Sequence, residues 1–329
     1  MSKVLLITGA TGKQGGAVID SLLALDPTGA SFTILAVTRD TSSPAAQRLL
    51  NKIPPGHNNL RLVQADLDDA PGLFSAARLA LGAATTSANP NAIWGVFSLQ
   101  PSLGPGISSD REIAQGTSLI DCAISAGVRH FIYSSVERSG DDKSWSNPTP
   151  VPHFQTKYHI ERHLRDATSP GRPGAGMGWT ILRPVAFMDN LAPGFKTSVF
   201  LAAMRNHLDE DGKRLQWIAT ADIGVFAAKA FADPEGWDGK AVGLAGDELS
   251  FAQMSGAFEG ATGSPAPAAH WFFGSALTKV AKELRLMLEW FADEGFKADI
   301  EGRRREHPGL LTMEAWLARK SGFVASEEE

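Results

Sequence analysis

Three glycines near the amino terminus have the spacing of a phosphate-binding turn. The chain begins MSKVLLITGATGKQGGAVIDSLLALD, so Gly9, Gly12 and Gly15 follow an apolar stretch and open an amphipathic one. Glycines let the chain turn sharply and let backbone N–H groups approach a pyrophosphate, and the helix N-terminus that follows favours negative charge. Lys13 follows Gly12 directly, without the GxxxxGK[ST] spacing of the nucleoside triphosphatase loop. The pattern therefore predicts a dinucleotide site of the strand–turn–helix kind.

The end of the second apolar stretch bears on which dinucleotide is bound. An acidic residue at this point would hold a ribose 2′-hydroxyl, but the sequence LAVTRD places Arg39 there. A guanidinium pairs bidentately with a 2′-phosphate, which favours NADP(H) over NAD(H). Asp40 keeps NAD(H) open as the alternative, because a shift of one residue would bring its carboxylate to the ribose.

Apolar and amphipathic segments alternate along the first half of the chain. This alternation predicts parallel strands joined by helical crossovers, an α/β doubly wound sheet of the Rossmann type. Strands are expected at 3–8, 32–38, 60–65, 92–99, 129–135 and 179–184, and helices at 12–25, 44–52, 110–127 and 155–168.

The pattern weakens beyond Pro184, where we expect a smaller α/β domain. Residues 1–184 are predicted to form the NADP-binding domain, with a return of the chain near 215–246. Residues 185–329 are predicted to form a C-terminal lid that binds substrate or partner. Strands are expected there at 215–220 and 241–246, and helices at 271–296 and 311–320. The polar segment 136–152 is expected to be a flexible flap or a plain surface loop.

Composition limits the class of protein. The 329 residues are 43% hydrophobic and carry a formal net charge of −5, which suits a globular protein and argues against direct nucleic-acid binding. The one cysteine, Cys122, excludes an internal disulfide and a thiolate metal site, and no metal is expected. Without an expected signal or membrane-spanning stretch, we expect a soluble cytoplasmic protein, with the nucleus as an alternative. The oligomeric state is left open.

A set of segments, taken in order, resembles the NmrA-like family of atypical short-chain dehydrogenases. They are ITGATGKQGGAV, AVTRDTSSPAAQRL, VQADLDD, GVRHFIYSSVE, HFQTKYHIERHLR, ILRPVAFMDNL and TADIGVFAAKAF, which cover most of residues 3–232. The resemblance implies a Rossmann domain with a small C-terminal domain. It places Asp66 and Leu67 beside the adenine, and Gln100 beside the adenosine ribose and nicotinamide. The expected cofactor-binding residues are Gly9, Thr11, Gly12, Lys13, Gln14, Gly15, Arg39, Asp66, Leu67, Gln100 and Lys157.

The same resemblance singles out HFQTK, residues 153–157. Short-chain dehydrogenases carry a tyrosine that donates a proton and a lysine that holds the nicotinamide ribose, in the pattern YxxxK. Here His153 replaces the tyrosine and Lys157 is kept. Pro152 suits a first helical turn, so the two side chains are expected one turn apart on one face. Ser134 or Ser135 is the candidate for the substrate-orienting serine, and either hydroxyl could instead satisfy nearby backbone.

The missing tyrosine leaves two functions open. NmrA-like proteins with HxxxK include dinucleotide sensors that regulate protein partners, and relatives such as the isoflavone reductases reduce substrates with the lysine alone. We therefore expect either a redox sensor acting through a regulatory partner or an NADPH-dependent reductase of a small carbonyl or enone compound. In the reductase, Lys157 would be the acid, with His153 and Ser135 as further catalytic candidates.

Two weaker features follow the expected sheet. Asp189 and Asn190 either line a substrate pocket or cap a helix. The aromatic residues Trp271, Phe272, Phe273 and Trp290 are expected to be core rather than cleft.

Overall fold

The computed structural model describes residues 2–53, 59–82, 93–102, 104, 106–208 and 212–323. The chain forms two compact units that alternate along the sequence. Unit 1 contains Met1–Ser135, Thr156–Leu182 and Ile223–Ala241, and unit 2 contains Val136–Gln155, Arg183–Asp222 and Val242–Glu329. The domain boundary at residue 184 stays a prediction.

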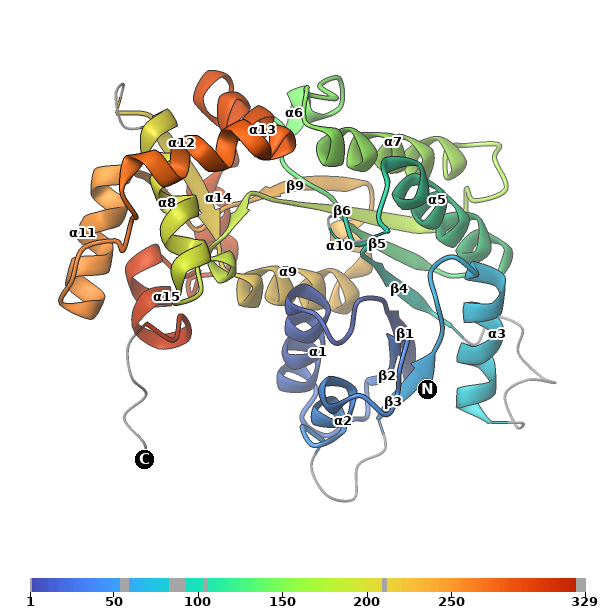
Figure 1. Ribbon diagram of the computed structural model, residues 1–329. Helices are drawn as coiled ribbons and strands as arrows, with labels where there is room; N and C mark the ends of the chain where they lie inside the picture. The colour runs from blue at the N-terminus through green and yellow to red at the C-terminus, as the bar shows by residue number, and fades with distance from the viewer. Residues whose placement is uncertain are drawn as a thin grey trace. The chain divides into compact units, whose positions relative to one another are not determined.

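A seven-stranded sheet has the order β3-β2-β1-β4-β5-β6-β9 (Figure 1). The strands from β3 to β6 in this order are parallel. The expected doubly wound sheet is confirmed. The strands are β1 (Lys3–Ile7), β2 (Phe32–Thr38), β3 (Leu60–Gln64), β4 (Gly95–Ser98), β5 (His130–Ser134), β6 (Gly178–Pro184) and β9 (Lys240–Leu244).

The central strands form unbroken apolar runs because helices cover both faces of the sheet. Leu5, Leu6 and Ile7 of β1 are completely buried. Leu5 pairs in register with Gly95 of β4. A Cβ at Gly95 would lie 2.9 Å from side-chain atoms of Leu5 and Phe231, so only glycine lets β4 lie under these side chains.

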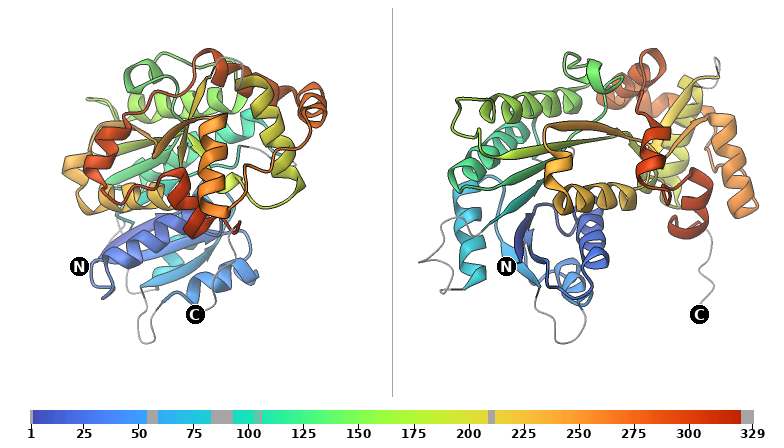
Figure 2. Two further views of the ribbon diagram at one scale, coloured as in Figure 1. Left: turned by 90° about the vertical axis from the view of Figure 1, so that its left-hand side faces the viewer. Right: turned by 180° about the vertical axis from the view of Figure 1, so that it is seen from behind.

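Two groups of helices cover the sheet in unit 1, with α1, α2 and α9 on one face and α3, α5 and α7 on the other (Figures 1 and 2). Glycines set the closest approaches within each layer. A Cβ on Gly224 of α9 would lie 2.3 Å from the carbonyl oxygen of Ala17 in α1, and one on Gly116 of α5 would lie 2.5 Å from Ile160 of α7. The helices are α1 (Lys13–Leu25), α2 (Pro44–Leu50), α3 (Ala70–Leu81), α5 (Ser109–Ser125), α7 (Pro152–Ala167), α9 (Thr220–Ala232) and α10 (Pro234–Trp237).

His130, at the start of β5, is a buried histidine that the fold keeps neutral. Thr180 Oγ1 donates its hydrogen to the carbonyl of Trp237. The 2.9 Å contact between His130 Nε2 and Thr180 Oγ1 must therefore use a hydrogen on the imidazole. Burial lowers the pKa of His130 from 6.5 to about 4, with Asp238 opposing this shift and Lys3 adding to it.

His130 should make the protein acid-sensitive between pH 6.5 and about pH 4. In this window the unfolded chain binds a proton that the folded chain does not, so the free energy of unfolding falls as the pH falls. We expect His130 to account for a loss of roughly 2 kcal/mol between pH 7 and pH 4.5. Urea unfolding of the wild type and His130→Gln at both pH values measures it. An equal pH dependence in both proteins would contradict this assignment.

Unit 2 contains a smaller sheet of the order β10-β8-β7. The expected strand at 215–220 is β8, and it belongs to this sheet and not to the large one. Helices α8 and α12 lie side by side (Figure 1). The elements are β7 (Ala186–Phe187), β8 (Arg214–Ile218), β10 (Asp247–Ser250), η1 (Met188–Asn190), α6 (Asp141–Ser144), α8 (Phe195–Leu208), α11 (Phe251–Thr262), α12 (Trp271–Val280), α13 (Lys282–Asp293), α14 (Ile300–Glu306) and α15 (Met313–Lys320).

The segment 136–152 is more than a plain surface loop, because it contains the helix α6 and two completely buried charged residues. The flexible flap stays a prediction. Glu137 and Arg138 are completely buried. The Arg138 guanidinium donates to the carbonyls of Val136, Ser144 and Asn147. Burial raises the pKa of Glu137, although backbone N–H groups, including that of Lys297, donate to its carboxylate. These bonds hold the segment in place because unpaired buried charges are costly.

The aromatic segment after residue 270 also differs from the expectation. Trp271 and Phe272 are 56% and 58% exposed, and Phe273 is also exposed, so the core assignment is wrong for these three. Trp290 is buried, as expected, and its ring lies 5.3 Å from that of Phe296. The expected helix 271–296 is divided at Ala281, whose φ of −102° and ψ of 80° are not helical.

Candidate active site

The predicted cofactor residues gather at one edge of the sheet in unit 1. The glycine turn follows β1, Arg39 follows β2, Asp66 and Leu67 follow β3, and Gln100 follows β4. Because these strands are parallel, their carboxyl ends meet at the same edge. This is the edge where open α/β sheets bind ligands.

The three glycines of the turn have three different geometries. Gly9 has a left-handed φ of +60°, which glycine adopts without strain. A Cβ on Gly15 would lie 2.3 Å from the carbonyl oxygen of Gly9, so Gly15 lets α1 pack on the turn. Gly12 is the N-cap in an extended conformation, and a Cβ there would lie 3.2 Å from that oxygen. Packing within the chain thus requires a glycine at position 15, whereas a Cβ at position 12 would need a shift of only a few tenths of an ångström.

The N-terminus of α1 is open to an anion. Gly12 provides no side-chain cap, and the first turn has no acidic residue. The N–H groups of the first helical turn lie beyond the reach of intrahelical acceptors, and the helix dipole places partial positive charge there. Thr11 and Lys13 are exposed beside this turn. Gln14 is buried instead, and its Oε1 accepts a hydrogen bond of 2.6 Å from Ser134 Oγ.

Arg39 and Asp40 differ in the hydrogen bonds that their side chains make. Both are exposed. Asp40 Oδ1 accepts from the backbone N–H and the hydroxyl of Ser42, at 2.8 and 2.6 Å, and the hydroxyl bond is the main cause of a lowered Asp40 pKa. Across the described ranges, no hydrogen bond or ion pair engages Arg39. The Asp40 carboxylate thus serves the turn that precedes α2, whereas the guanidinium is available.

Gln100 presents a buried acceptor at this edge. Its Nε2 donates to Ser98 Oγ at 2.9 Å. Its Oε1 is buried and has no hydrogen-bond partner in the part of the chain that the structure describes. On the β3 side of the edge, Asp66 is exposed and accepts from the Asp68 backbone, and Leu67 is half-buried. An unpartnered buried amide oxygen is costly without a ligand or water to bind it.

Lys157 is held by a carboxylate that the sequence analysis missed. Its Nζ lies 2.7 Å from Glu112 Oε1, and the two side chains are 7% and 1% exposed. Nζ also donates to the carbonyl of Gln100 at 3.4 Å. One signal in the sequence could have revealed Glu112. It is a charged residue on the buried face of α5, which continues through Gln115, Gly116 and Leu119.

His153 and Lys157 share α7, as expected, but they have separate partners. His153 Nδ1 lies 2.6 Å from Glu283 Oε1, within unit 2. Lys157 pairs with Glu112, within unit 1. Ser135 is buried, and its backbone N–H donates to the carbonyl of Leu182. Each basic candidate is therefore tied to its own carboxylate.

Asp189 and Thr8 connect neighbouring elements through hydrogen bonds of their side chains. The Asp189 carboxylate accepts from the backbone N–H and the hydroxyl of Thr220, which opens α9, so the capping alternative holds for Asp189. Thr8, which the sequence analysis did not single out, joins β1 to β4. Its hydroxyl contacts the carbonyls of Phe97 and Leu99 and accepts from the Leu99 N–H.

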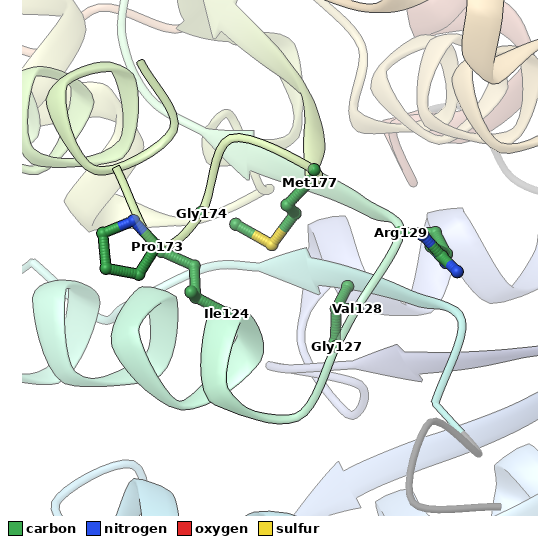
Figure 3. Close-up of a pocket in the computed structure, with 8 residues that line it drawn as sticks. Ile124, Gly127, Val128, Arg129, Pro173, Gly174 and Met177 are labelled. Carbon is green, nitrogen blue, oxygen red and sulfur yellow. The ribbon is translucent and has the colours of Figure 1, made fainter. Parts of the chain in front are cut away.

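A surface pocket of about 150 Å³ lies elsewhere in unit 1 (Figure 3). Ile124, Pro173 and Met177 line it, and Figure 3 shows Arg129 pointing away from these three side chains. Its lining includes the residues that precede β5 and β6, so it lies at the amino ends of these strands, opposite to the candidate site. It is smaller than the ~300 Å³ or more of typical ligand pockets.

The candidate site thus suits an elongated anionic ligand. An uncapped helix N-terminus attracts phosphate groups, an available guanidinium such as that of Arg39 can pair with a further anion, and the unpartnered Gln100 Oε1 can accept a hydrogen bond. This combination on a doubly wound parallel sheet defines a dinucleotide-binding type of fold.

The chain belongs to the NmrA-like family, whose family model matches residues 1–317. Two curated relatives are NmrA-like family domain-containing oxidoreductases. FrzB of Cladobotryum sp is 25% identical over 283 residues, which cover 80% of this chain and 74% of FrzB. The protein malD of Malbranchea aurantiaca is 26% identical over 278 residues, with the same shares of the two chains.

Solved structures share the fold. NmrA, a negative transcriptional regulator solved with NADP, has a TM-score of 0.65 at 20% identity, over 97% of this chain and 95% of NmrA. The quinone oxidoreductase QOR2 of Escherichia coli, complexed with NADPH, has 0.65 at 21% identity, over 96% and 98%. Triphenylmethane reductase of Citrobacter sp., complexed with NADP(H), has 0.67 at 14% identity, over 97% and 100%.

Among the helices of the described residues, none is both long enough and apolar enough to cross a membrane. In the same ranges, no group of three or more His, Cys, Asp or Glu side chains is placed to hold a metal ion.

Proposed function

We propose that this protein binds NADP(H) at the carboxyl edge of its large sheet. The observation that carries the proposal is the bare backbone of Gly12 at the uncapped N-terminus of α1, where a side chain would need a shift of only a few tenths of an ångström in the turn. The pyrophosphate would accept hydrogen bonds from the N–H groups of this turn, and Arg39 would bind the 2′-phosphate. The bound dinucleotide would supply or accept a hydride at its nicotinamide.

The ligands of the structural relatives support this assignment. NmrA has been solved with NADP and, in another structure, with NAD. QOR2 and triphenylmethane reductase have been solved with NADPH and NADP(H). The available guanidinium of Arg39, against the engaged carboxylate of Asp40, favours the phosphorylated dinucleotide in this chain.

For the use of the dinucleotide, we favour a redox sensor that regulates a protein partner. A proton donor must release its proton, but release from Lys157 would leave the Glu112 carboxylate buried and unpaired. The His153 imidazole is paired with Glu283. Neither group is arranged as a free acid. Bound NADP(H) would then act by changing the affinity for the partner.

A reductase is the second candidate, and the names of the two curated relatives favour it. FrzB and malD are both called oxidoreductases. In this case a small carbonyl or enone compound would accept the hydride, and Lys157, aided by His153 and Ser135, would supply the proton.

Two measurements on the same preparation distinguish the candidates. Calorimetric titrations with NADP and NADPH test for binding and for a preference between the two redox states. A panel of carbonyl and enone compounds is then screened for loss of NADPH absorbance. A sensor binds the cofactor and consumes no NADPH above the background rate. Sustained consumption with a defined compound would replace the sensor by the reductase.

Arg39 should set the preference for NADP(H). A charged hydrogen bond to phosphate contributes roughly 1.5–3 kcal/mol, so Arg39→Ala should weaken NADPH binding about 10- to 100-fold and leave NADH nearly unchanged. Calorimetry with both cofactors measures the two affinities. Arg48, an exposed arginine in the last turn of α2, provides the matched control, because Arg48→Ala removes the same charge elsewhere. Equal weakening of NADPH and NADH by Arg39→Ala would make Arg39 structural.

A further inference from the structure

We propose that Glu112 is a positioning residue that fixes the Lys157 ammonium for the nicotinamide half of NADP(H). This inference rests on the proposed function. Glu112 is one of the most deeply buried carboxylates of unit 1, with 1% of its side chain exposed. A buried carboxylate needs hydrogen-bond donors, and Glu112 Oε1 has two, Lys157 Nζ at 2.7 Å and Ser102 Oγ at 2.8 Å.

The packing of α5 against α7 makes this ion pair rigid. Gly116 lies one turn after Glu112 on α5, and Ile160 lies about one turn after Lys157 on α7. A Cβ on Gly116 would lie 2.5 Å from Ile160 Cδ1, so the two helices are in close contact about one turn from the ion pair. A surface lysine samples many rotamers, but Lys157 is confined between Glu112 and the carbonyl of Gln100.

The order of the strands places Lys157 on one side of the glycine turn and Arg39 on the other. Arg39 follows β2, the turn follows β1, and Gln100, which accepts from Lys157, follows β4. Strand β1 lies between β2 and β4 in the sheet. A dinucleotide with its pyrophosphate at the turn therefore extends one half toward Arg39 and the other toward Lys157. With the 2′-phosphate at Arg39, the nicotinamide half lies on the Lys157 side.

The ion pair limits where the ammonium can point. Lys157 has three N–H donors, and Glu112 and the Gln100 carbonyl direct two of them. The third donor has no hydrogen-bond acceptor in the ranges of the chain that the structure describes, and the ammonium lies over the Tyr133 ring, 5.8 Å from its centroid. Glu112 thus acts through Lys157, because it fixes the orientation of the ammonium. In this orientation, the third N–H of Lys157 and the buried Gln100 Oε1 are both available to the same bound ligand.

The test compares a whole cofactor with its adenosine half. Calorimetry is run with NADPH and with adenosine 2′,5′-bisphosphate, which carries the 2′-phosphate but no nicotinamide. We expect Glu112→Gln to weaken NADPH about tenfold and to leave the bisphosphate unchanged, because only the nicotinamide half needs the oriented ammonium. Arg39→Ala should weaken both ligands. Glu112→Gln in combination with Lys157→Met should be no weaker for NADPH than Lys157→Met alone, because Glu112 acts through Lys157.

Each other result counts against the proposal. Equal weakening of both ligands by Glu112→Gln would mean that the ion pair only stabilises unit 1. An unchanged NADPH affinity in Glu112→Gln, together with a loss in Lys157→Met, would mean that Lys157 needs no positioning. If Glu112→Gln does not fold, the double variant removes both charges together and is compared with Lys157→Met in the same titrations. If the proposed function is wrong, the result is different, because the wild type will then bind neither NADPH nor adenosine 2′,5′-bisphosphate.

Discussion

Gly12→Val is expected to weaken NADPH binding at least a hundredfold in a protein that still folds. Gly12 has a φ of −92° and a ψ of 177°, an extended conformation that valine adopts readily. A Cβ there would lie 3.2 Å from the Gly9 carbonyl oxygen, so the turn must move by only a few tenths of an ångström. The added methyl groups would occupy the space in which the pyrophosphate approaches the backbone. Calorimetry measures the loss, and circular dichroism and thermal unfolding establish the fold.

Gly15→Ala is the matched control for the same turn. A Cβ at Gly15 would lie 2.3 Å from one backbone oxygen and 2.8 Å from another, and backbone atoms cannot move aside without shifting α1 against β1. This variant should lose stability, with or without ligand. A Gly12→Val protein that binds NADPH like the wild type would remove the phosphate-binding role of the turn.

Lys157→Ala is expected to lower the free energy of unfolding by about 3 kcal/mol or more. It removes the only cation paired with Glu112 among the described residues and leaves a carboxylate that is 1% exposed without its charge partner. Urea unfolding at pH 7 measures the effect. His153→Ala, which breaks an ion pair whose Glu283 side chain is 39% exposed, should cost less.

This expectation affects how the lysine is tested for catalysis. A loss of NADPH turnover in Lys157→Ala could follow from instability alone, so Lys157→Met combined with Glu112→Gln is the better variant. It replaces the ion pair by uncharged side chains of similar length, which is often tolerated. If Lys157→Ala is as stable as the wild type, the buried ion pair contributes nothing to the fold, and the argument against Lys157 as a free acid also weakens.

Much of unit 1 could be predicted from the sequence because its strands are buried on both faces. Such strands appear as unbroken apolar runs between amphipathic helices, and β2 begins and ends at Phe32 and Thr38, as expected. The positions after these strands then follow from the parallel topology. The positions of the predicted cofactor residues at one edge agree with this logic, and their binding roles stay predictions.

Unit 2 was predicted less well because its elements depend on contacts that are distant in the sequence. Strand β10 has the sequence DELS, which carries no apolar alternation, and it is a strand because it pairs with β8. The aromatic residues at the start of α12 were expected in the core because of their size, but Trp271 and Phe272 are exposed. Residue type does not determine which face of a helix meets a neighbour.

The ion-pair partners of Lys157 and His153 could not be predicted from the sequence either. Glu112 precedes Lys157 by 45 positions and lies on another helix, and only the packing of α5 against α7 brings the two together. Glu283, the partner of His153, is 130 positions away. The HxxxK spacing predicted that both side chains lie on one helix, and this is confirmed, but spacing alone could not reveal the ion pairs that restrain each of them.

The most direct test of the central claim is a pair of calorimetric titrations of the wild-type protein with NADPH and NADH. We expect NADPH to bind with one site per chain and at least tenfold more tightly than NADH, because Arg39 is available for the 2′-phosphate and the α1 N-terminus is open to the pyrophosphate. Binding of neither cofactor, or tighter binding of NADH, would contradict it.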